Sequence, residues 1–162
     1  EGLGVQQAYT GWEVFSLSSD DARELYTLRS CLEGLAARLA AENIDIEGKK
    51  ALTTALKTLK LATQRKDWRA IAEADLAVHK TIVSIANHKR LLQQYALIID
   101  TVLLYILHTN RMVESAASIY PEHKALVDAI LSGDASLSEE LASEHVTVHG
   151  RRLTESLRDT GH

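Results

Sequence analysis

The feature that most constrains the fold is the spacing of the apolar residues, which recur at steps of three and four from about residue 18 onward. In the first such segment the stripe consists of Leu25, Leu28, Leu32, Leu35 and Leu39. This spacing places the side chains on one face of an α-helix. Since the 162-residue chain has only one proline, little interrupts the pattern. The sequence therefore predicts an all-α fold.

Short breaks divide the pattern into about six helices. The segments run approximately over 19–43, 47–65, 68–86, 88–110, 121–132 and 136–157. Asp67 and Asn87 are candidate caps for the third and fourth helices. The fifth is expected to begin at Pro121 and to stop at Gly133. Connections this short favour an antiparallel helical bundle over residues 18–162.

Residues 1–17 differ from the rest of the chain. They combine three glycines with the aromatic residues Trp12 and Phe15, a composition typical of irregular or strand-like structure. The chain begins at Glu1 rather than at methionine. We expect 1–17 to be a linker preceding the helical domain, and the chain to be a fragment or a processed product.

Charge and cysteine content exclude several classes of protein. With 18 basic and 22 acidic residues the net charge is −4, unlike that of a domain that grips nucleic acid over a broad surface. Cys31 is the only cysteine, so an intrachain disulfide and a cysteine metal cluster are excluded. The longest apolar run, 95–107, contains Asp100 and is shorter than the roughly 18–20 residues of a membrane span. A cytoplasmic protein without a membrane partner is expected.

Four residues able to bind a metal lie on the apolar stripes. Asp75 and His79 are spaced i,i+4, and His123 and His145 fall in the stripes of the fifth and sixth helices. Converging imidazoles and a carboxylate from facing helices predict a divalent transition-metal site, with Zn or Ni favoured and Mn or Fe as further candidates. The alternative is that each histidine is a satisfied core residue and that Asp75 and His79 simply share a hydrogen bond.

Two arginines are candidates for binding an anionic ligand. Arg29 lies beside the inward face of the first helix, where it would clamp a carboxylate or pair with Glu33 one turn later. Arg111 is either a second pocket cation or an ordinary cation at a helix end.

Four segments together resemble a known family. They are 24–33, which contains Arg29-x-x-Leu32-Glu33; Asp75-x3-His79 followed by 84–87; 122–134, which begins Glu-His; and His145. This set resembles the C-terminal effector-binding FCD domain of the FadR subfamily of GntR transcription regulators.

The resemblance implies an all-helical domain that dimerises and controls an attached winged helix-turn-helix. It implies the metal ligands Asp75, His79, His123 and His145, and an effector-binding set of Arg29, Asn87 and Arg111 that receives a small organic acid. Residues 1–17 resemble the end of the wing and the linker. Operator DNA would be bound only through the N-terminal domain, which this sequence lacks.

The preferred hypothesis is thus a ligand-sensing domain with no catalytic residues, in a transcription regulator that is not an enzyme. The first alternative is a metal-dependent hydrolase or hydratase, which would need a general base; Glu73, Glu122 and Glu144 are candidates only by sequence proximity. The second alternative is a dimerising bundle with a metal-free pocket.

Overall fold

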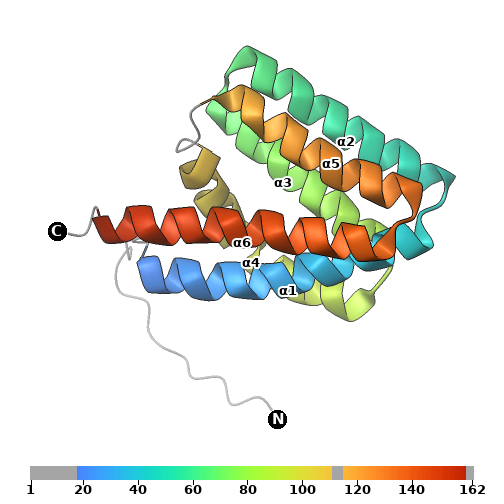
Figure 1. Ribbon diagram of the computed structural model, residues 1–162, viewed down its shortest axis with the longest axis horizontal. Helices are drawn as coiled ribbons and strands as arrows, with labels where there is room; N and C mark the ends of the chain where they lie inside the picture. Colours follow the sequence, from blue (N-terminus) through green and yellow to red (C-terminus); the bar gives the residue numbers. More distant parts are fainter. Residues whose placement is uncertain (1–17, 111–114, 160–162) are drawn as a thin grey trace, which may run out of the picture.

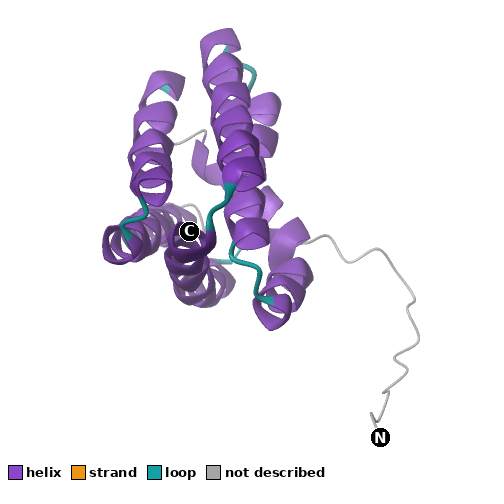
Figure 2. Cartoon of the chain, turned by 90° about the vertical axis from the view of Figure 1, so that its right-hand side faces the viewer, coloured by secondary structure: helices purple, strands orange, loops and turns teal. Residues whose placement is uncertain are grey.

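The computed structural model describes residues 18–110 and 115–159, and over these two ranges it contains helices and no strand (Figures 1 and 2). The elements are α1 (Ser19–Asn43), α2 (Ile46–Arg65), α3 (Trp68–Ile85), α4 (Lys89–Asn110), the short 3₁₀ helix η1 (Ala116–Ser118), α5 (Ile119–Ser132) and α6 (Ala135–Asp159). The predicted all-α bundle of about six helices is confirmed. The predicted linker and wing remnant, 1–17, lies outside the described residues.

The helices form two groups that meet at the centre of the molecule. The terminal helices α1 and α6 pack side by side along much of their length, whereas α2, α3 and α5 pack together beside them (Figure 1). The larger core cluster includes Leu52, Ile71, Val78 and Ile130, and the smaller one joins α1, α3, α4 and α6 around Tyr105 and Leu153. As a result α1, α3, α5 and α6 all contribute side chains to the region between the groups.

Helix ends follow local capping rules. Asp67 caps α3 as predicted, because its carboxylate accepts hydrogen bonds from the N–H groups of Arg69 and Ala70 at 3.1 and 3.2 Å. Gly133 ends α5 in the left-handed conformation, with φ of 78°.

Two predicted helix starts were wrong. His88, and not Asn87, caps α4, since its ring Nδ1 accepts the N–H of Leu91 at 3.1 Å; Asn87 instead takes the left-handed conformation, with φ of 51°, in the preceding turn. α5 begins at Ile119, before Pro121, because η1 leads directly into it. A proline within the first turn is tolerated, since the N–H it lacks would have no partner inside the helix.

Helix α4 is more apolar than the sequence analysis recognised. By length and composition alone its 22 residues, with a mean hydropathy of 1.4, would suffice to cross a membrane, as would those of some core helices of soluble proteins. The analysis missed this because it considered only the run 95–107. In the bundle, Tyr95, Val102 and Tyr105 are buried, while Leu97 is 78% exposed.

The close approach of α1 and α6 depends on Gly150. A Cβ atom there would lie 2.5 Å from Cβ of Tyr26, a buried residue of α1. We expect Gly150→Ala to lower the free energy of unfolding by about 1–3 kcal/mol through this clash, although Ala in an unobstructed helix stabilises by about 0.5–1 kcal/mol over Gly. Urea unfolding measures the difference.

Gly34→Ala is the matched control on the same interface. The atom that its Cβ would meet is the hydroxyl of Ser143, which can rotate away, so we expect a smaller loss. A Gly150→Ala chain as stable as the unsubstituted protein would contradict the assignment of Gly150 as a packing requirement.

Candidate metal centre

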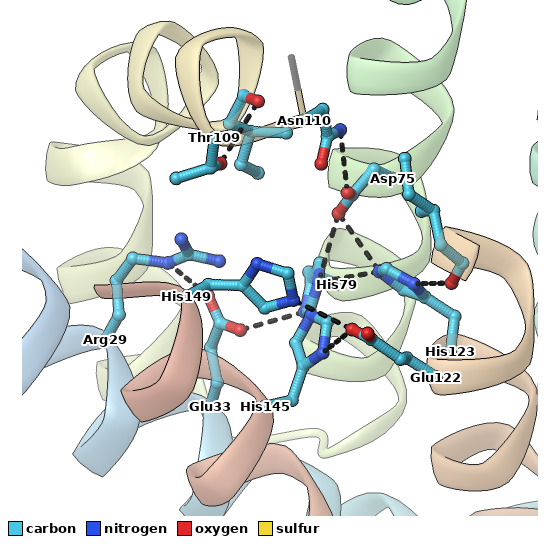
Figure 3. Close-up of polar contacts among 12 residues, drawn as sticks. Arg29, Glu33, Asp75, His79, Thr109, Asn110, Glu122, His123, His145 and His149 are labelled. Carbon is cyan, nitrogen blue, oxygen red and sulfur yellow. Dashed lines mark hydrogen bonds and ion pairs between the residues drawn. The ribbon is translucent and has the colours of Figure 1, made fainter. Parts of the chain in front are cut away.

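The structure brings the four predicted metal ligands together between the two helix groups. Asp75 and His79 come from α3, His123 from the first turns of α5, and His145 from α6 (Figure 3). Oδ1 of Asp75 lies 3.2 Å from Nε2 of His79 and 3.1 Å from Nε2 of His123. One nitrogen of each of the three histidines lies within 4.8 Å of one nitrogen of each of the others.

Neighbouring acceptors fix the orientation of two of these rings. His79 Nδ1 lies 2.8 Å from Oε2 of Glu33, and His123 Nδ1 lies 2.9 Å from the carbonyl oxygen of Ile119. Both partners only accept hydrogen bonds, so each Nδ1 must carry the proton. In the neutral rings the lone pair is then on Nε2, which faces the centre.

Three acceptor atoms therefore face one another at short range. Nε2 of His79, Nε2 of His123 and Oδ1 of Asp75 are separated by 3.1–3.3 Å. Lone pairs this close repel unless a cation lies between them, and either a proton or a metal ion fills that role.

The spacing fits a tetrahedral metal ion. With zinc–nitrogen bonds of about 2.0–2.1 Å, two ligands of a tetrahedral site are about 3.3 Å apart, and the two Nε2 atoms are separated by 3.3 Å. Glu33 and the Ile119 carbonyl orient the rings in the way that partners of metal-bound histidines do. The residues present thus suit Zn²⁺ or a similar ion.

In the metal-free arrangement a proton takes the cation's place. Burial by itself would lower the pKa of His79, but the carboxylates of Glu33 and Asp75 outweigh it and raise that pKa to about 9. Burial would raise the pKa of Asp75, yet the imidazoles of His123 and His79 hold it well below its ordinary value. Burial lowers the pKa of His145 to about 3, which keeps this ring neutral and ready to bind a metal.

Arg29 fulfils both alternatives left open by the sequence. Its Nε donates to Oε1 of Glu33 at 2.8 Å within α1, and its guanidinium also lines the pocket at the histidines. The arginine is 2% exposed and lies over the ring of Tyr26, 4.7 Å from the ring centre. Tyr95 donates to the same Glu33 oxygen at 2.9 Å, so that carboxylate has several partners.

The other two predicted effector residues are not part of this cluster as the structure describes it. Asn87 lies in the α3–α4 turn, where it lines a separate hollow with Asn43 and Asp45. Arg111 lies outside the described residues.

Sequence reasoning missed four polar residues at the site. They are Glu33 as a partner of His79, Asn110, Glu122 and His149. Asn110 ends α4 and donates to Oδ2 of Asp75 at 3.1 Å; nothing in the sequence signals a contact between residues 35 positions apart. The i,i+4 spacing of His145 and His149 was visible, but it did not identify their common partner, Glu122.

The pocket between these side chains is small. Its volume is about 10 Å³, and its lining includes Arg29, Asp75, His79, His123 and Asn110. That is close to the minimum that holds one water molecule, so an ion fits without rearrangement. An organic acid would require side chains at the pocket to move.

Comparison with known proteins identifies the family. The model of the FCD domain matches residues 24–148. The chain belongs to the FCD domain family. The match contains all four segments on which the sequence resemblance rested, and the all-helical fold agrees with it.

Curated relatives of this FCD domain are transcriptional repressors. It is 29% identical over 150 residues to a probable D-xylose utilization operon transcriptional repressor of Paenarthrobacter nicotinovorans, covering 91% of this chain and 65% of the relative. It is 28% identical over 130 residues to the galactonate operon transcriptional repressor of Escherichia coli K12, covering 79% and 56%. The chain therefore spans less than two thirds of each relative. Regulators rather than enzymes among its relatives support the prediction that it is not an enzyme.

Solved structures share the fold of this FCD domain. A GntR-family regulator from Pseudomonas syringae superposes with a TM-score of 0.73 at 19% identity, covering 88% of this chain and 60% of the other. Streptococcus agalactiae GntR gives 0.70 at 16% identity, covering 85% and 62%.

Proposed function

We propose that this FCD domain is the ligand-sensing part of a cytoplasmic GntR-type transcription regulator of the FadR subfamily, and that it holds a divalent transition-metal ion. Asp75, His79, His123 and His145 would be the ligands. The observation that carries the proposal is the set of three acceptor atoms, 3.1–3.3 Å apart, that face one another with their rings held in the metal-binding orientation. We favour Zn²⁺ or Ni²⁺, with Mn²⁺ or Fe²⁺ as further candidates, because the donors are imidazoles and one carboxylate.

A small carboxylate is the ligand class that best fits the surroundings of the ion. The bound metal would supply an electrophilic position to which a carboxylate oxygen can bind. Arg29 adds a buried positive charge on the wall of the same pocket, and its planar guanidinium suits carboxylate geometry. The E. coli relative is named for galactonate, an organic acid, which supports this class.

Regulation would proceed through a homodimer. The ligands come from three different helices, so effector binding would alter how α3, α5 and α6 are held together. In a dimer this change would shift the relation between two N-terminal winged helix-turn-helix domains and thus their fit to operator half-sites. The repressors among the relatives support this role.

Metal analysis of untagged protein, followed by thermal unfolding with a panel of small organic acids, tests the proposal. We expect about one ion per chain, and an acid present at about 100 times its Kd should stabilise the metal-loaded protein by about 2.7 kcal/mol. The neutral amide of the same acid is the control and should have no effect. Less than a tenth of an equivalent of any transition metal, with no rebinding after chelation, would overturn the metal assignment.

A further inference from the structure

A second cluster of metal-binding side chains lies outside the four-residue centre. Oε2 of Glu122 is 2.8 Å from Nε2 of His149 and 3.4 Å from Nδ1 of His145 (Figure 3). The histidines are one turn apart on α6, with ring centres separated by 4.5 Å, and Glu122 comes from the first turn of α5. Ligand atoms of all three residues lie within 4.8 Å of one another.

This outer cluster is more accessible than the inner one. The side chains of His79 and His123 are only 2% and 1% exposed, whereas those of His145 and His149 are 13% and 12% exposed and that of Glu122 is 41% exposed. A hollow of about 260 Å³ adjoins the cluster and is lined by Glu122, Glu144, His145 and His149. Water molecules thus have room to complete the coordination of an ion.

We propose that Glu122, His145 and His149 form a second, outer site for a divalent transition-metal ion. Two imidazoles and one carboxylate, with water in the remaining position, are a donor set that zinc accepts. Two histidines at i and i+4 on one helix reach a single ion because they project from the same face.

His145 belongs to both donor sets, which makes the two sites neighbours. Its ring centre lies 4.7 Å from that of His123 and 4.5 Å from that of His149. Nδ1 faces Glu122, and a neutral imidazole has only one lone pair. The inner and outer ions therefore compete for His145, and the outer site is free to fill when the inner donors are removed.

The test is a Co²⁺ titration of the full chain carrying Asp75→Asn and His79→Gln, followed by the visible absorption of the bound ion. We expect this variant to bind one Co²⁺ with micromolar affinity, and the further change His149→Gln to weaken binding at least tenfold. Glu144→Gln, which alters another carboxylate in the same hollow, is the matched control and should change the affinity less than twofold.

Each outcome separates the outer site from the proposed inner one. If the unsubstituted chain binds Co²⁺ but the folded inner-site variant binds none up to about 1 mM, a free energy near −4 kcal/mol, the outer site is wrong and the inner one stands. If both bind equally and both lose the ion with His149→Gln, the outer site stands and the inner one fails. Binding that His149→Gln leaves unchanged also overturns the proposal. Should circular dichroism show that the double variant is unfolded, the isosteric Asp75→Asn alone replaces it, with the same criteria.

Discussion

Replacing Arg29 with methionine is expected to lower the free energy of unfolding by about 3–5 kcal/mol, because the change leaves a charge buried without its main partner. Glu33 is 3% exposed and accepts the Arg29 hydrogen bond at 2.8 Å. Burial would raise the pKa of Glu33, but Arg29 and then His79 hold it far below its ordinary value. Without the guanidinium this carboxylate would have to take up a proton or remain charged in a dry environment.

Chemical unfolding of chelator-treated protein measures this loss. Arg38→Met is the matched control, since Arg38 forms the same i,i+4 pair with Glu42 on the same helix but about half exposed; we expect no measurable change in its unfolding midpoint. The double variant Arg29→Met/Glu33→Met should be more stable than the single one, because no charge is then left unpaired. Equal losses for Arg29→Met and Arg38→Met would contradict this account of the ion pair.

Replacing His123 with glutamine is expected to weaken Zn²⁺ or Ni²⁺ binding by about 100-fold or more, since even partners of metal ligands contribute 10–100-fold to affinity. His123 is 1% exposed, and its Nε2 lies close to both Asp75 and His79. Glutamine retains a polar side chain but not an imidazole lone pair held by the Ile119 carbonyl. Competition with a chromophoric chelator of known affinity measures the change.

The control for this prediction is His108→Gln on α4, which is not among the residues that line the inner pocket. It should bind the metal as tightly as the unsubstituted chain. If both substitutions weaken binding equally, His123 is not a ligand and the ion lies elsewhere.

Features set by local sequence were predicted most accurately. The apolar stripes gave the correct number and class of helices, and Asp67 and Gly133 marked helix ends because their effects act within one turn. The convergence of Asp75, His79, His123 and His145 was also anticipated, because a buried Asp or His on an apolar stripe needs a polar partner in the core.

Long-range geometry explains what could not be predicted. Asn87 follows Asp75 by 12 residues, about 18 Å along a helix, so its place in the same sequence signature does not bring it to the same site. Asn110 reaches Asp75 only because α4 packs across the end of the site with a particular register. That register depends on packing over several helices and leaves no pattern in the sequence.

The hydrogen bond from the Tyr105 hydroxyl to Oδ2 of Asp21, 2.7 Å long, joins α4 to the first turn of α1. Arg29 and Ser18 belong to the same continuous stretch of helix and cap, 11 residues apart, or about 16 Å along the axis. A helix of this length moves as a stiff lever: a tilt of about 5° at the binding site displaces Ser18 by about 1.4 Å, the product of that angle and the 16 Å arm. The position at which residues 1–17 join the bundle is thus the point where a small adjustment around the ion becomes an amplified movement, and Tyr105 makes α4 share in it.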